Sequence, residues 1–109
     1  MQVLIYEDQD GKAPYSDWVD GLRDKQGAVK IEFRVRRIRL GNLGHWEPVG
    51  EGVFELKIDH GPGYRVYFGR IGTMVVLLCG GDKKTQRRDV VQAKEFWRDF
   101  KERYHGKKD

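Results

Sequence analysis

The apolar run MVVLLC, Met74–Cys79, constrains the fold more than any other stretch of this chain. All of its side chains are apolar, so an extended segment here has no face that water would solvate favourably. A short apolar run of this kind, bounded by glycines, predicts a central strand that is covered on both faces. The fold must therefore pack other elements against both faces of a sheet.

Two segments with alternating polarity precede this run and predict a β-hairpin. The alternation extends over Val53–Asp59 and Tyr64–Arg70, and Gly61-Pro62-Gly63 forms a three-residue loop closed by His60 and Tyr64. Residues two apart in a strand lie on the same face, so each segment has one apolar and one polar face. The apolar residues are Phe54, Leu56 and Ile58 in the first segment and Tyr64, Val66 and Phe68 in the second.

The polar face of this hairpin is the first candidate for a functional site. Matching the two apolar faces predicts that Asp59 lies opposite Arg65 and Lys57 opposite Tyr67, with Glu55 beside them. Such cross-strand pairs are common on solvated sheets, where each contributes about 0.2–1 kcal/mol. The alternation alone therefore leaves two interpretations open, an ordinary sheet surface and a site.

A basic segment next to the hairpin favours the second interpretation. The stretch GGDKKTQRRD follows the apolar run and holds four basic residues within six positions: Lys83, Lys84, Arg87 and Arg88. Segments that follow strand ends commonly carry function, so a polar sheet face beside this segment predicts a phosphate-binding surface. The stretch lacks the spacing of a P-loop, and no parallel βαβ unit surrounds it.

Helical spacing predicts three helices. The first begins at Pro14, a favourable first helical position, and reaches Leu22; Gln26-Gly27 separates it from the second, Ala28–Leu40. The third has Thr85 as its predicted N-cap. Its apolar stripe steps by three and four residues through Val90, Ala93, Trp97, Phe100 and Tyr104.

The second predicted helix has an apolar stripe and a basic side. The stripe consists of Ala28, Ile31, Val35 and Ile38, and the basic side of Lys30, Arg34, Arg37 and Arg39. We predict that Arg34 and Arg37 contribute to binding of an anionic partner. The glycine-rich segment Gly41–Gly52, which contains Trp46, ends the helix and is expected to be a loop.

Composition limits the class of protein. The chain has 109 residues and a net charge of +4, which suits one compact domain over residues 1–109 and favours an anionic partner. The single cysteine, Cys79, lies in the apolar run and is expected to be a core residue. No stretch approaches the ~20 apolar residues of a membrane span, and the N-terminus lacks a signal pattern, which predicts a cytoplasmic protein without a membrane partner.

The positions of the histidines do not predict a metal site. His45, His60 and His105 are scattered without the spacing of metal ligands, so we expect no metal and no cofactor. His60 closes the hairpin loop and is either a general acid or base or merely a turn residue.

With a first strand at Val3–Ile5, the order of elements is β-α-α-β-β-β-α, an α+β domain with a small, mainly antiparallel sheet packed against helices. This order, the hairpin FELKIDHGPGYRVYF and its continuation VVLLCGGDKKTQRRDVVQAKEFW resemble the RelE/ParE superfamily of toxins. The closest likeness is to the HigB-like, phage-derived branch of addiction module killer proteins. The resemblance covers nearly the whole chain and implies a RelE-like fold and the toxin half of a type II toxin–antitoxin module.

The resemblance also implies an activity. RelE-like members enter the ribosomal A site and cut mRNA without a metal, by attack of the substrate 2′-hydroxyl on the adjacent phosphate. By position, Lys57 matches a catalytic lysine and Arg65 the arginine that binds the scissile phosphate. Lys83 or Lys84 lies where the family has another phosphate-contacting residue.

Two departures from the family concern the acid and the base. Glu55 replaces the first of two lysines on the second strand, and the late-chain acid or base has no clear equivalent, Gln86 being among the nearest residues. Tyr67 and His60 are the hypothetical substitutes. The resemblance implies an antitoxin partner, expected to be a helix-turn-helix protein, in addition to the ribosome and mRNA. ParE-like inhibition of DNA gyrase is the alternative function, and a catalytically inactive regulatory relative is another.

Overall fold

The computed structural model describes residues 1–106, with side chains through Tyr104, so the side chain of His105 lies outside the described part. Its helices and strands follow one another as β1 (Gln2–Ile5), α1 (Pro14–Asp20), α2 (Lys25–Arg39), β2 (Trp46–Gly50), β3 (Val53–Ile58), β4 (Tyr64–Ile71), β5 (Met74–Gly81), a 3₁₀ turn (Lys83–Thr85) and α3 (Gln86–Gly106). The α+β class predicted from the sequence is confirmed.

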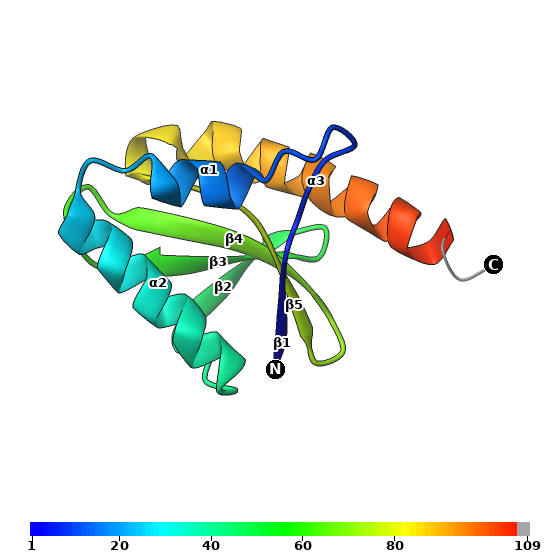
Figure 1. Ribbon diagram of the computed structural model, residues 1–109, viewed down its shortest axis with the longest axis horizontal. Coiled ribbons are helices and arrows are strands. Elements are labelled where there is room, and N and C mark those ends of the chain that lie inside the picture. Colours follow the sequence, from blue (N-terminus) through cyan, green and yellow to red (C-terminus); the bar gives the residue numbers. More distant parts are fainter. Residues whose placement is uncertain (107–109) are drawn as a thin grey trace.

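The strands form one mixed sheet in the order β1-β5-β4-β3-β2 (Figure 1). β1 pairs with β5 in parallel, and the other neighbours are antiparallel, so the sheet is mainly antiparallel as expected. β5 lies between β1 and β4, and residues 75–79 are buried. The apolar run is therefore a central strand, covered on both faces.

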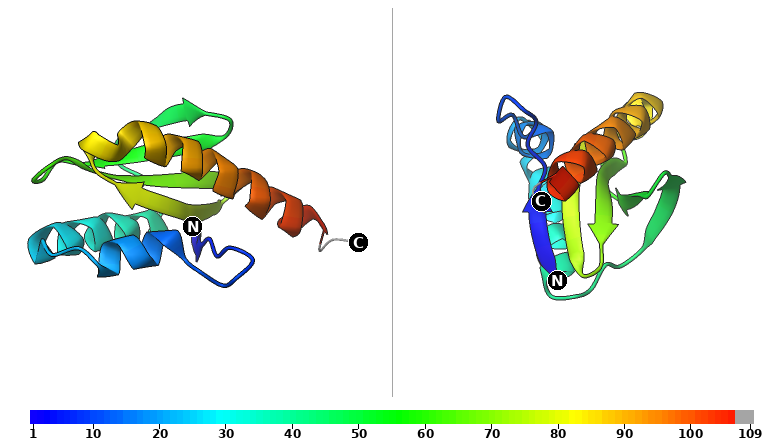
Figure 2. Two further views of the ribbon diagram at one scale, coloured as in Figure 1. Left: turned by 90° about the horizontal axis from the view of Figure 1, so that it is seen from above. Right: turned by 90° about the vertical axis from the view of Figure 1, so that its right-hand side faces the viewer.

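Helices cover both faces of the sheet. α1 and α2 lie together on one face and α3 crosses the other (Figure 2). The first face packs Leu56, Phe68 and the α2 residue Ile31 into one core, while the second packs Tyr67 against the α3 residue Trp97. The polar face predicted for the hairpin is thus the face that α3 covers.

The segment expected to be a loop contains an edge strand, β2, which pairs antiparallel with β3. The expectation failed because Pro48 and the surrounding glycines resemble loop composition, whereas an edge strand tolerates proline. Trp46 packs at right angles on Phe54, with ring centroids 5.0 Å apart, and this contact fixes the strand against the core.

α2 begins earlier than predicted. Asp24 is its N-cap, and the carboxylate accepts a hydrogen bond of 2.9 Å from the Gly27 N–H. Gln26-Gly27 therefore lies inside the first turn, where the sequence indicated a break. A Cβ on Gly27 would lie 2.6 Å from the Tyr64 ring, so close packing explains the glycine.

α3 also begins differently, because a 3₁₀ turn precedes it. The predicted N-cap, Thr85, is the last residue of this turn, and Asp82 is the capping residue. The Asp82 carboxylate accepts hydrogen bonds from the backbone N–H groups of Lys84 and Thr85, at 2.8 and 3.2 Å. Capping by Asp82 thereby sets the path of the chain between β5 and α3.

The predicted faces of the hairpin are right but the predicted pairing is wrong by two residues. Lys57 lies opposite Arg65, and Glu55 opposite Tyr67, while Asp59 lies beyond the last pair, Ile58–Tyr64. The turn is therefore longer than the expected three-residue loop. A shift of two residues keeps every side chain on its face, so the hydrophobic pattern could not detect it.

Gly69 tests how tightly α3 packs on the sheet. A Cβ on this residue would lie 2.3 Å from Cε3 of Trp97, a side chain that is only 3% exposed. We expect Gly69→Ala to lower the free energy of unfolding by about 1–3 kcal/mol through overpacking. Urea denaturation measures this, with Thr73→Ala in the exposed β4–β5 turn as control; equal stability of the two variants would contradict the packing.

Candidate functional site

Three basic residues, Lys57, Arg65 and Lys83, lie side by side at the edge of the sheet where β3 and β5 end and β4 begins, and we call them the cationic row. Lys57 pairs with Arg65, and Arg65 pairs in turn with Gly81, two residues before Lys83. Arg65 Nη1 donates a hydrogen bond of 2.9 Å to the Gly63 carbonyl oxygen. A Cβ on Gly63 would lie 3.9 Å from Cβ of Lys83, so the turn brings Arg65 and Lys83 together.

The pairing within the row is electrostatically unfavourable. Directly opposed residues of an antiparallel pair have their Cβ atoms about 4.5–5.5 Å apart, and like charges at this distance destabilise a sheet. Lys57 is exposed and Arg65 is only 8% exposed. Asp59, predicted to neutralise Arg65, does not lie opposite it. An unfavourable arrangement of this kind is typical of a site that receives an anion.

A buried carboxylate holds Arg65 in place. Glu55, 2% exposed, lies with its Oε2 3.6 Å from Arg65 Nε, and Gln86 Nε2 of α3 donates a hydrogen bond of 2.9 Å to the same oxygen. Both groups of the ion pair are shielded from water, which strengthens their attraction. The sequence predicted Glu55 on the polar face of the hairpin but not its burial or its hydrogen bond with Gln86, and the acidic residue on the same face as Arg65 was the available signal.

Tyr67 lies on the same face but in the interior. It is fully buried beneath α3, and its hydroxyl has no hydrogen-bond partner among the described residues. Burial, and then the charge of Glu55, raise the pKa of the Tyr67 phenol. Tyr67 therefore stays protonated at neutral pH, and the structure does not bring its hydroxyl to the surface.

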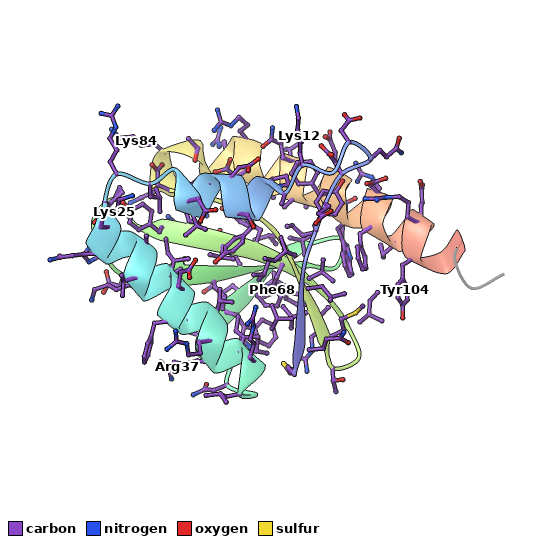
Figure 3. All side chains as sticks on the ribbon, viewed as in Figure 1. Lys12, Lys25, Arg37, Phe68, Lys84 and Tyr104 are labelled. Atoms are coloured by element: carbon purple, nitrogen blue, oxygen red, sulfur yellow. The ribbon has the colours of Figure 1, made fainter. Side chains whose placement is uncertain are left out.

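The remaining basic residues of the β5–α3 segment face solvent. Lys84, Arg87 and Arg88 are exposed, and Lys84 projects from the end of the molecule where α2 begins (Figure 3). Arg88 Nε lies 3.6 Å from Oδ1 of the buried Asp89. These side chains extend the positive charge of the cationic row along the start of α3.

His60 is held on the opposite side of the sheet. Its Nε2 lies 3.3 Å from Asp24 Oδ2, which also accepts a hydrogen bond of 2.8 Å from the Tyr64 hydroxyl. The hydrogen bond from the Gly27 N–H, followed by that from Tyr64, lowers the pKa of Asp24. Since Tyr64 belongs to the core beneath α1 and α2, the structure does not bring His60 to the cationic row.

Arg34 and Arg37, the residues of α2 predicted to bind RNA, also lie apart from the side chains of the cationic row. Arg34 donates through Nη1 to the Lys57 carbonyl oxygen at 2.9 Å, and through Nη2 to the carbonyl oxygens of Leu43 and His45 at 3.4 and 3.3 Å. Burial lowers the pKa of Arg34. Its guanidinium thus organises the backbone, while Arg37 lies farther along α2, away from Lys84 (Figure 3).

Within the described residues, no group of three His, Cys, Asp or Glu side chains could hold a metal ion. None of the described helices is long and apolar enough to cross a membrane.

The chain is similar to a described protein family and to an individual bacterial protein. The family model described as "Phage derived protein Gp49-like" matches residues 17–95, a range that contains the whole cationic row. An uncharacterized protein of Haemophilus influenzae is 46% identical over 81 residues, which cover 73% of this chain and 82% of that protein.

Replacement of Glu55 tests the buried ion pair. Glu55→Gln keeps the shape of the side chain but leaves the charge of Arg65 uncompensated, so we expect the free energy of unfolding to fall by about 3–5 kcal/mol. Glu47→Gln is the matched control, because Glu47 lies opposite Glu55 on β2 but is exposed. Chemical denaturation of both variants decides: a Glu55→Gln protein as stable as the control would show that the pair does not hold Arg65.

Proposed function

The chain belongs to the phage-derived Gp49-like family, and on this premise we propose that it is the toxin of a type II toxin–antitoxin module, acting as a ribosome-dependent mRNA endonuclease. The family is typical of such modules. The observation that carries the proposal is the pairing of Lys57 with Arg65 at the strand ends, extended by Lys83. Closely spaced cations suit a phosphodiester, whose negative charge increases in the transition state.

The proposed chemistry needs little from the protein beyond charge and proton transfer. The 2′-hydroxyl of the mRNA attacks the adjacent phosphate, so the substrate supplies its own nucleophile, and the proposed reaction uses neither metal nor cofactor. Arg65 binds the scissile phosphate and Lys57 assists at the reacting oxygens. Lys83 and Lys84, with Arg87 and Arg88, contact neighbouring phosphates, which position the strand without reading its sequence.

The two acid–base candidates from the sequence need rearrangement to act. Tyr67 would reach RNA only if the first turns of α3 moved, since it is completely covered. His60 would have to leave Asp24 and the α2 side of the sheet. The raised pKa of the Tyr67 phenol suits a proton donor. Neither Tyr67 nor His60, however, meets the cationic row in the structure.

We also propose an antitoxin partner, a helix-turn-helix protein that presents an acidic amphipathic segment. Val29 and Phe33 of α2 are 67% and 56% exposed. They lie between two hollows of about 510 and 370 Å³, one toward α1 and the other toward the end of β3. Basic residues outnumber the single acidic residue, Glu32, along α2. An exposed apolar ridge on a basic helix fits a segment with apolar and acidic side chains.

Expression in a bacterial host tests the endonuclease. We expect the unmodified protein to arrest growth and to produce new cuts within translated codons, measured by primer extension on an abundant transcript. Lys57→Ala should reduce cleavage by about 10²–10⁴-fold, the usual contribution of a group that transfers a proton. Lys12→Ala, an exposed lysine outside the row, should cleave normally. Growth arrest with intact transcripts would favour gyrase inhibition instead, and the absence of arrest would indicate an inactive relative.

Co-expression with the neighbouring gene product tests the partner. Phe33→Asp places a charge in the centre of the apolar ridge and should weaken the complex by about 30-fold, the effect of losing a central anchor worth about 2 kcal/mol. Val91→Asp is the matched control, because Val91 is a similarly exposed apolar residue of α3, 57% exposed. Calorimetry on the purified pair measures both affinities. Equal affinities would place the partner elsewhere, and no complex with the unmodified protein would argue against the module itself.

A further inference from the structure

His45 lies next to Lys57, although the sequence separates them by a hairpin. Arg34 joins the carbonyl oxygens of the two residues with the terminal nitrogens of one guanidinium, at 3.3 Å to His45 and 2.9 Å to Lys57. The strand pairing agrees, because Trp46 pairs with Leu56, and His45 and Lys57 are the next residues outward on each strand. His45 thus extends the cationic row by one position, on the side away from Arg65.

Its side chain lies on the side of the sheet where the row presents its charges. Glu47 pairs with Glu55, and directly opposed residues share a face, which for Glu55 is also that of Lys57 and Arg65. His45 Nε2 lies 3.4 Å from Glu47 Oε1, so the imidazole leans toward this face. The His45 side chain is 71% exposed, which leaves the rest of the ring accessible to a ligand.

The acid–base candidates predicted from the sequence, Tyr67 and His60, do not meet the cationic row. Lys57, Arg65 and Lys83 are cations, whereas Tyr67 is buried and His60 is paired with Asp24 across the sheet. In-line cleavage by a 2′-hydroxyl requires a base for the hydroxyl proton and an acid for the leaving oxygen. An imidazole is the side chain best suited to accept a proton near neutral pH.

We propose that His45 is the general base of the cleavage reaction and that Glu47 is its positioning residue, an inference that rests on the proposed endonuclease function. Nδ1 of His45 takes the proton of the 2′-hydroxyl as the 2′-oxygen bonds to phosphorus. The bond from phosphorus to the 5′-oxygen breaks, and the Lys57 ammonium gives that oxygen a proton. The products are a 2′,3′-cyclic phosphate and a 5′-hydroxyl, while Arg65 stabilises the charge on the phosphate.

Glu47 determines which nitrogen is the base. A carboxylate beside Nε2 favours the tautomer that carries its proton there, and the lone pair is then on Nδ1. Arg34 contributes from α2 by fixing the backbone of His45 and Lys57 relative to each other. The structure therefore supplies a base, its orienting carboxylate, an acid and a phosphate ligand from adjacent strands and the residue that precedes β2.

A substrate with a modified leaving group distinguishes the base from the acid. We would measure single-turnover cleavage of a ribosome-bound mRNA, either unmodified or with a bridging 5′-phosphorothiolate at the cut site. A thiolate leaves without a proton, so the sulfur substrate should restore cleavage by Lys57→Ala. It should leave His45→Gln slow by about 10²–10⁴-fold relative to the unmodified protein. Glu47→Gln should lower kcat by a smaller factor with little change in KM.

The controls separate this inference from the proposed function. Lys12→Ala should react like the unmodified protein, and the exposed position of His45 predicts an unchanged melting temperature for His45→Gln. If the unmodified protein cuts mRNA and His45→Gln cuts at the same rate, the base assignment is wrong and the endonuclease stands. Restoration of His45→Gln by the sulfur substrate would make His45 the acid instead and would overturn the assignment. A protein that cuts no ribosome-bound mRNA would refute the proposed function and the base together.

Discussion

The ion pair between Glu55 and Arg65 is the interaction on which the candidate site depends. It lies between the sheet and α3, where burying either the carboxylate or the guanidinium alone would be costly. Gln86 of α3 satisfies the same carboxylate oxygen. Arg65 can therefore lie opposite Lys57, because its own charge is balanced from inside the protein by Glu55.

The sheet separates two surfaces with different chemistry. The cationic row belongs to the α3 side, whereas the exposed apolar ridge of Val29 and Phe33 belongs to α2 on the other side. Arg34 connects them, since it is part of α2 and holds the backbone carbonyl of Lys57. The position of the row is thus set jointly by α3, through Gln86 and Glu55, and by α2, through Arg34.

The sequence predicted those features that follow from hydrophobic periodicity. The central strand, the faces of the hairpin and the stripe of α3 all appear as expected, because burial follows from side-chain polarity. Hydrophobic periodicity does not record the other features. The register of the hairpin depends on the length of its turn, the start of α2 on the hydrogen bond to Asp24, and β2 on its position at the edge of the sheet. For the same reason His45 looked isolated: its proximity to Lys57 arises from the β2–β3 pairing.

The distribution of charge argues that stability alone did not shape the strand ends. A sheet selected only for stability would place an acidic residue opposite Arg65, as in the pairing with Asp59 that the sequence predicts. The structure instead places the acid beneath Arg65 and a lysine opposite it, so the balancing carboxylate is buried and the charge of Lys57 is exposed. Local rules of pairing are broken at Lys57 and Arg65, as they are at the neighbouring pair Glu47 and Glu55, and such breaks are expected where a protein meets its ligand.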